Sequence, residues 1–240
     1  MILTIANQKG GTAKTTTAAA LAQAAAHRGR RTLAIDLDPQ SNLSFILDAD
    51  TGQPGTLDLL QGEPPNIQHI AANLDAIAAT WDLQTVSSGR GSARRLRAAI
   101  APISSAYDLI VIDTPPTAGE LQYNALMACD KLIIPLQADI VGLQGLYQIA
   151  DTAQQIRQSN PGLTIAGYIL TRYSGRSTLA KQLAEQIKER AAEMGIPFLM
   201  AIRDAVAIRE AQTLHRSIYD YAPNSKPAAD YMTLLDKLIE

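Results

Sequence analysis

Cysteine is nearly absent from this 240-residue chain, in which Cys129 is the only one. A single cysteine excludes an internal disulfide and any CxxC zinc or redox motif. It also argues against an iron–sulfur cluster shared between subunits, which would need two cysteines from each. Because Cys129 lies among apolar residues just before a predicted strand, we interpret it as a small buried side chain in the core.

Aromatic residues and an excess of charge of either sign are also lacking. Aromatics make up only 5% of the residues, so stacking platforms for single-stranded nucleic acid are not expected. The formal net charge is −2, and any binding to nucleic acid must therefore rely on a local group of cations. No apolar run reaches transmembrane length, and no export signal precedes the first strand-like run. We therefore expect a cytoplasmic protein.

The sequence does contain a regular alternation of apolar strand-like runs and helical patterns. Strands are expected at Ile2–Ala6, Arg31–Ile35, Leu109–Ile112, Lys131–Pro135, Thr164–Leu170 and Pro197–Ile202, and helices near 15–27, 93–101, 119–129, 142–158, 178–194 and 226–239. The irregular stretch 48–92 is expected to hold short helices, a strand near 74–78 and surface loops. This pattern predicts one α/β domain over residues 1–240, a doubly wound, mostly parallel sheet with helices on both faces.

The first strand leads into a glycine-bearing turn and a helix start, Gln8-Lys9-Gly10-Gly11-Thr12-Ala13-Lys14-Thr15-Thr16. Free amides at a helix start bind anions, and the turn has the character of a phosphate loop. Lys14 is expected to reach the β- and γ-phosphates of a nucleotide, and Thr15 to bind magnesium. The predicted nucleotide-binding residues are Gly10, Gly11, Thr12, Ala13, Lys14, Thr15 and Thr16.

Two positions in this loop are unusual. The common pattern has glycine directly before the lysine, where this chain has Ala13, and we expect that the position does not need a positive φ. A second lysine, Lys9, stands at the front of the loop. Lys14 already occupies the phosphate-binding position, which indicates an additional task for Lys9.

Three carboxylates follow buried strands and are expected at the same edge of the sheet. Asp36 and Asp38 lie two residues apart at a strand end, so they point the same way. We expect Asp36 to bind magnesium through water, and Asp38 to orient or deprotonate an attacking water. Asp113 ends the run Leu109–Ile112 in a Walker B arrangement, in which the carboxylate holds magnesium.

Together these motifs resemble the ParA/Soj branch of the deviant-Walker (MinD/ParA-type) ATPases, in the short form without an N-terminal helix-turn-helix region. The resemblance extends from Met1 nearly to Glu240 and includes the following segments: Gln8–Thr16, Asp36–Gln40, Asp113–Pro116, Asn124–Leu126, Ile169–Arg176, Arg209–Ala211 and Tyr221–Ser225. It implies a deviant-Walker P-loop NTPase fold and an ATPase with ATP and Mg²⁺ as cofactors.

The resemblance also implies roles for particular residues. Lys9 would be the signature lysine that reaches across an ATP-sandwich homodimer to the partner's phosphates. Lys14, Thr15 and Thr16 would hold phosphates and magnesium. Asp38 would position the hydrolytic water, Asp113 would be the Walker B carboxylate, and the segment 203–209 would lie near the adenine.

The function implied is DNA partitioning, the segregation of a plasmid or chromosome. The ATP-bound dimer would bind double-stranded DNA non-specifically on the nucleoid and leave it when a ParB-like centromere-binding protein stimulates an otherwise slow hydrolysis. Cations in the C-terminal half are candidates for DNA contacts, above all Arg176, Arg203 and Lys181.

Two alternatives belong to other classes: an ATPase that positions a non-DNA cargo, and a MinD-like ATPase that associates with the membrane. The second needs a basic amphipathic helix at the C-terminus. Residues 226–239 do carry an apolar stripe, composed of Tyr231, Leu234, Leu235, Leu238 and Ile239. Nearby Asp230 and Asp236 would be repelled by anionic lipid. We therefore interpret the stripe as packing on the domain, and expect no membrane partner.

Overall fold

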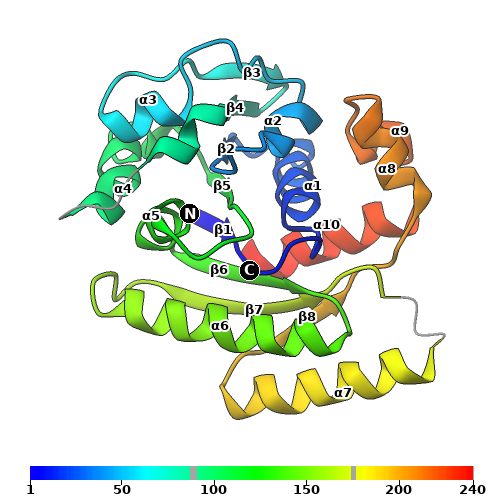
Figure 1. The fold of residues 1–240 in the computed structure, drawn as a ribbon. Coiled ribbons are helices and arrows are strands. Elements are labelled where there is room, and N and C mark those ends of the chain that lie inside the picture. The colour runs from blue at the N-terminus through cyan, green and yellow to red at the C-terminus, as the bar shows by residue number, and fades with distance from the viewer. Residues whose placement is uncertain (87–90, 174–176, 240) are drawn as a thin grey trace.

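The computed structural model describes residues 1–86, 91–173 and 177–239, which are arranged around one eight-stranded sheet (Figure 1). The strands are β1 (Ile2–Ile5), β2 (Thr32–Asp36), β3 (Gln68–Ala71), β4 (Leu74–Ile77), β5 (Leu109–Asp113), β6 (Lys131–Leu136), β7 (Thr164–Leu170) and β8 (Phe198–Ala201). The α-helices are α1 (Lys14–His27), α2 (Asn42–Ile46), α3 (Thr56–Gln61), α4 (Arg95–Ile100), α5 (Glu120–Ala128), α6 (Ile140–Arg157), α7 (Thr178–Glu193), α8 (Val206–Thr213), α9 (Ile218–Tyr221) and α10 (Lys226–Ile239). Short 3-10 helices cover Trp81–Thr85, Ser92–Arg94 and Ser104–Ala106.

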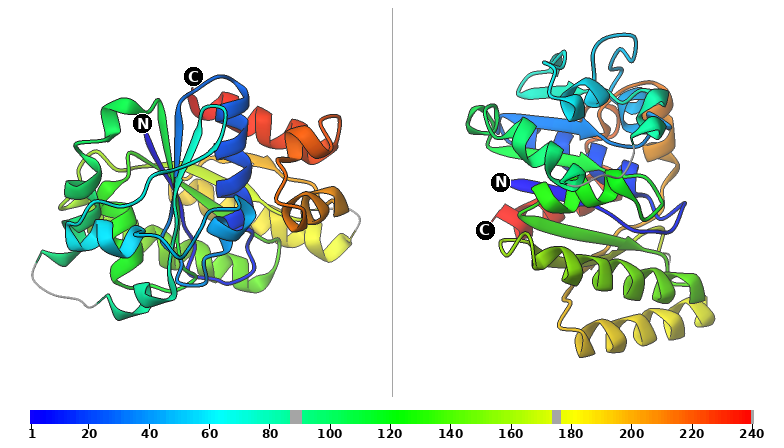
Figure 2. Two further views of the ribbon diagram at one scale, coloured as in Figure 1. Left: turned by 90° about the horizontal axis from the view of Figure 1, so that it is seen from above. Right: turned by 60° about the vertical axis from the view of Figure 1, so that its left-hand side comes forward.

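The strand order is β3-β4-β2-β5-β1-β6-β7-β8, and every neighbouring pair is parallel except β3–β4. Helices cover both faces (Figure 2). One core cluster joins α1 and α10 to the sheet, and two further clusters lie beneath α3, α4 and α5 and beneath α6 and α7. The predicted doubly wound, mostly parallel fold is therefore confirmed.

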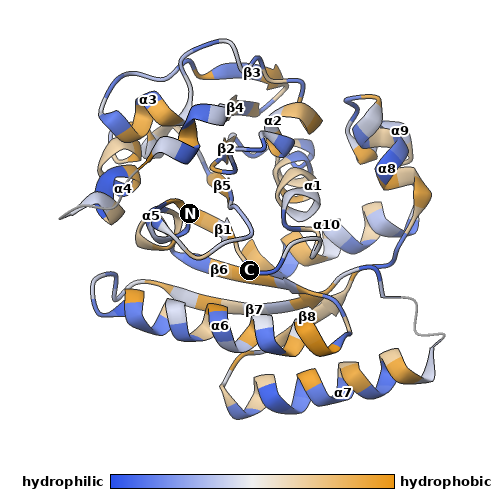
Figure 3. Cartoon of the chain, viewed as in Figure 1, coloured by the Kyte–Doolittle hydropathy of each residue, from blue (hydrophilic) through white to orange (hydrophobic). Residues whose placement is uncertain are grey.

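The central strands are apolar along their whole length because both faces of the sheet are covered. All five residues of β2 and of β5 are buried. The hydropathy colouring shows the same layering, with hydrophilic residues gathered on the outer sides of α6 and α7 (Figure 3). Cys129 is 1% exposed, which confirms its interpretation as a core residue.

The register of the central strands brings the sequence motifs to one edge. Ile5 at the end of β1 pairs with Asp113 at the end of β5, and Asp113 also pairs with Asp36 at the end of β2. The phosphate loop follows β1 directly, between Ile5 and Lys14. The loop and the carboxylates therefore meet at the carboxyl ends of the strands, where ligands bind in open α/β sheets.

The C-terminal apolar stripe is part of the core. Tyr231, Leu234, Leu235 and Leu238 of α10 are each 2% exposed or less and pack against α1. The hydroxyl of Tyr231 lies 3.2 Å from that of Thr17 in α1. The prediction that this stripe packs on the domain is confirmed.

Candidate functional site

The phosphate loop wraps around its own lysine. The Nζ atom of Lys14 donates a hydrogen bond to the carbonyl of Lys9 at 2.9 Å, so the ammonium is held at the centre of the loop. Burial lowers the pKa of Lys14, while the carboxylates of Asp113 and Asp38 act in the opposite direction. A buried cation beside free helix-start amides is the arrangement that binds a polyphosphate.

Ala13 adopts a left-handed backbone conformation, with φ 66° and ψ 33°, directly before the start of α1. The expectation that this position does not need a positive φ is therefore wrong. The turn reverses the chain between the loop and the helix, and its geometry is the one that favours glycine. An alanine in this conformation brings its Cβ close to a carbonyl oxygen, which costs about 1 kcal/mol or more.

Asp113 is an orphaned carboxylate in the centre of the site. It is 0% exposed, and both of its oxygens lack a hydrogen-bond partner among the described residues. Desolvation, with the nearby Asp36 carboxylate second, raises the pKa of Asp113 well above its ordinary value. A buried carboxylate without a partner is costly unless a cation neutralises it. Asp113 therefore fits a magnesium ion, for which Thr15 at the start of α1 would supply a hydroxyl ligand.

Asp36 and Asp38 have different surroundings although they are two residues apart. One oxygen of Asp36 accepts hydrogen bonds from the amide and the hydroxyl of Ser44, each at 2.8 Å, and the other accepts the amide of Asp38 at 3.0 Å. Burial raises the pKa of Asp36 to about 6, and the Ser44 hydrogen bonds oppose that shift. The Asp36 carboxylate thus anchors the chain at the start of α2.

Asp38, in contrast, keeps a carboxylate oxygen toward the ligand. Its Oδ1 accepts the amide of Gln40 at 3.0 Å, and its side chain lines the cavity beside the phosphate loop. Of the two acids, Asp38 is therefore the one available to act on a water.

Lys9 is held by its own chain. Its ammonium lies 2.6 Å from Oδ2 and 2.8 Å from Oδ1 of Asp139, the residue that precedes α6. Oδ1 of Asp139 also accepts the amide of Gly142 at 2.6 Å and so caps the helix. In this chain Lys9 turns toward α6, and the side chain is 20% exposed. The sequence analysis did not single out Asp139, which its position after an apolar strand and before a helix, as an N-cap residue, marks as worth considering.

A cavity of about 580 Å³ opens over the phosphate loop. All seven predicted nucleotide-binding residues line it, together with Asp38, Pro116, Arg172, Arg209 and Gln212. Gln212 of α8 donates to the hydroxyl of Thr16 at 3.2 Å and ties α8 to the loop. Arg203 and Arg209 both line a smaller neighbouring cavity that also includes Ala13 and Thr16. The size suits a nucleotide.

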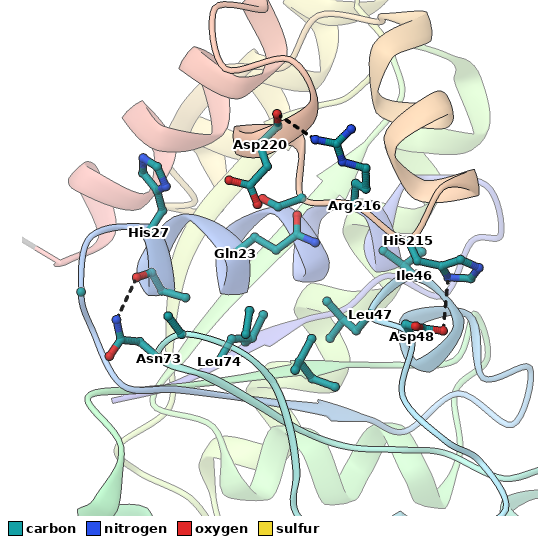
Figure 4. A pocket seen from close by; sticks show the side chains of 16 residues that line it. Gln23, His27, Ile46, Leu47, Asp48, Asn73, Leu74, His215, Arg216 and Asp220 are labelled. Atoms are coloured by element: carbon teal, nitrogen blue, oxygen red, sulfur yellow. Dashed lines mark hydrogen bonds and ion pairs between the residues drawn. The ribbon is translucent and has the colours of Figure 1, made fainter.

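A second large cavity, of about 650 Å³, lies at the other end of α1 (Figure 4). Its walls come from the end of α1, the end of α2, the β3–β4 turn and the residues around α9. His215 reaches across it toward Asp48, at 4.0 Å. None of the predicted site residues lines this cavity.

The candidate DNA-contact residues do not share one environment. Arg176 lies outside the described residues. Lys181 is exposed on α7, whereas the guanidinium of Arg203 forms an ion pair with Asp230 of α10, with Nε 2.9 Å from Oδ2. Arg203 is thus engaged in a tertiary contact, and Lys181 is the more available cation.

The fold and the site define a P-loop ATPase: a mostly parallel sheet, a phosphate loop at a helix start, a buried lysine and a strand-terminal carboxylate. Comparisons with known proteins agree. Residues 1–165 match the family model described as AAA domain. The chain is 35% identical over 241 residues to the chromosome-partitioning ATPase Soj of Thermus thermophilus, which covers 99% of this chain and 94% of that protein.

Two solved structures are similar over nearly the whole chain. The apo structure of McdA from Cyanothece has a TM-score of 0.87 at 25% identity and covers 99% of this chain and 98% of that one. MinD of Pyrococcus horikoshii, complexed with Mg-ADP, has a TM-score of 0.82 at 27% identity and covers 99% and 95%. The chain belongs to the ParA/Soj/MinD family of ATPases. Among its described residues, no helix is both long and apolar enough to cross a membrane.

Proposed function

We propose that this chain is a DNA-partitioning ATPase that works as an ATP-sandwich dimer. The observation that supports this most strongly is the pair of lysines in one phosphate loop. Lys14 is buried inside its own loop, while Lys9 stands at the front and is bound only to Asp139 at the edge of α6. The related Soj protein is named for chromosome partitioning.

In this proposal, Lys14 and the loop amides bind the phosphates of ATP, and Thr15 and Asp113 hold magnesium. The metal neutralises charge on the transferring phosphoryl group. Asp38 accepts the proton of the attacking water. Lys9 leaves Asp139 and stabilises the phosphates bound to the partner copy, which adds the second cation that one loop cannot supply.

The need for a second copy explains why hydrolysis should be slow in isolation. A ParB-like partner would accelerate it and so release the dimer from nucleoid DNA. DNA contacts would come from cations such as Lys181 and Arg176, because the net charge of −2 leaves no attractive overall field.

A gel shift on random double-stranded DNA tests this function. We expect binding with ATP and magnesium, none without nucleotide, and no preference among sequences. Lys181→Gln should weaken binding to every sequence and reduce the log–log salt slope by about 0.9, the loss of one phosphate contact. Arg31→Gln makes the same charge change at the opposite edge of the sheet, before β2, and should have no effect. Binding that ignores nucleotide, or that depends on sequence, would contradict the proposal.

A second candidate function is the positioning of a non-DNA cargo, which the similarity to McdA favours. It predicts the same ATP-dependent dimer, so the gel shift does not separate it; the identity of the activating partner does. A MinD-like membrane function is less favoured, because the apolar stripe of α10 is buried in the core and offers no face to a bilayer. Flotation with liposomes in the presence of ATP checks that point.

A further inference from the structure

A hollow of about 520 Å³ adjoins Asp38 on the side away from the nucleotide cavity. Its apolar walls are Trp81, Leu83, Val86, Pro115, Pro116 and Leu121. Trp81 is the only tryptophan of the sequence and is 58% exposed. We refer to this feature as the Trp81 hollow. A large exposed aromatic side chain in an apolar depression is typical of a surface that another protein covers.

Gln122 adds an independent sign that the hollow receives something. Its side chain lines the hollow and is 0% exposed, and its Nε2 has no hydrogen-bond acceptor among the described residues. The amide cannot simply turn over, because Oε1 accepts a hydrogen bond from Gln8 at 3.2 Å. An oxygen on a docked segment would supply the missing partner.

A complementary protrusion stands on the other side of the site. The first two residues of α6, Ile140 and Val141, are 76% and 50% exposed and follow directly after Asp139, which holds Lys9. We call Ile140 and Val141 the α6 knob. Tyr147, two turns along the same helix, is 43% exposed. Large aliphatic residues so exposed at a helix start are stable in water only at a cost that docking removes.

The topology places these two features on opposite sides of the phosphate loop. The α6 knob follows β6, which neighbours β1 on one side, while Trp81 follows β4, which lies beyond β5 and β2 on the other. Figure 1 shows α6 on one side of β1 and α3 and α4 on the other. A two-fold axis near the loop therefore exchanges the two sides, which is what a self-complementary contact between identical chains requires.

We propose that the α6 knob of each copy docks in the Trp81 hollow of the other when two copies join through Lys9. This inference rests on the ATP-dependent dimer of the proposed function and adds the surface that holds it. The charges agree with it, since Asp38 and Glu120 line the hollow and Lys9 stands beside the knob. Each dimer contains the contact twice.

The lone tryptophan gives a direct test. Trp81 emission is recorded with and without ATP and magnesium, while sedimentation of the same samples reports the dimer. We expect emission to move to shorter wavelength only where a dimer forms, because the indole leaves water. Lys9→Ala with ATP controls for nucleotide binding alone and should leave the emission unchanged.

A matched pair of variants tests the knob. Ile140→Ser should weaken the ATP-dependent dimer by about tenfold or more, the equivalent of losing the burial of one aliphatic side chain. Leu179→Ser, equally apolar and 63% exposed on α7, should have no effect. A dimer that forms without a change at Trp81 would overturn the docking and leave the proposed function standing. Absence of any ATP-dependent dimer would overturn both. A change at Trp81 only after a ParB-like protein is added would assign the hollow to that partner instead and overturn the docking.

Discussion

One carboxylate, that of Asp139, both caps helix α6 and holds Lys9. Its Oδ1 accepts the amide of Gly142 at 2.6 Å, and its two oxygens lie 2.8 and 2.6 Å from the Lys9 ammonium. The ion pair is partly exposed, with side chains 20% and 41% accessible, so its contribution to stability is small. It nevertheless determines where Lys9 points in a single chain, and Lys9 must leave it to reach another copy.

Asp139→Asn should tighten the ATP-dependent dimer. Asparagine still caps the helix, but it removes the charge that retains Lys9. We expect the dimer dissociation constant to fall by up to about fivefold, since an exposed ion pair contributes up to about 1 kcal/mol. Sedimentation with ATP and magnesium measures it, and Asp236→Asn, which breaks the exposed pair with Arg28, is the control. A weaker dimer would mean that Asp139 is needed in the interface itself.

Ala13→Gly should stabilise the free protein. The left-handed conformation at Ala13 is strained for alanine and free for glycine. The greater flexibility of glycine in the unfolded chain offsets part of the gain, which leaves about 0.5–1 kcal/mol and a rise of a few degrees in the melting temperature, about 2–4 °C for each kcal/mol. Ala20→Gly, in the body of α1, should lower the melting temperature instead. A less stable Ala13→Gly protein would show that the loop is not strained at this residue.

Asp36 and Asp38 should separate by assay. Asp38→Ala is expected to bind ATP and to keep its stability, while hydrolysis falls by about 10²-fold, the usual scale for losing a general base. Asp36→Ala should be less stable by about 2 kcal/mol or more, because it strands the amide and hydroxyl of Ser44 and the amide of Asp38. Thermal melting and phosphate release measure the two effects. An Asp38→Ala enzyme that hydrolyses ATP at the normal rate would assign the base elsewhere.

The fold was predictable because the central strands are continuous apolar runs separated by helical patterns. Strand β3 was not, since Gln68–Ala71 is a short edge strand of intermediate and exposed residues that lies within the irregular stretch 48–92. Antiparallel pairing with β4 holds it in place, and no local pattern encodes that contact.

The site was predictable where one segment carries the whole motif. The phosphate loop and Asp113 are such segments, and all seven predicted loop residues line one cavity. The partners of those residues were not predictable, because they are distant in sequence. Asp139 is 130 positions from Lys9, and the hydrogen bonds of Asp36 go to Ser44, on the following helix. The backbone conformation of Ala13 was also missed, since alanine seldom adopts it and the residue type gave no hint.

Sedimentation of Lys9→Ala with ATP and magnesium tests the central claim most directly. The account predicts that this variant binds ATP, remains a monomer, and neither hydrolyses ATP nor holds DNA. Lys14→Ala should bind no nucleotide at all, which separates the two lysines. Mixing Lys9→Ala with Asp38→Ala, which retains Lys9, should restore a mixed dimer with one working site. A stable ATP-dependent dimer of Lys9→Ala alone would contradict the account.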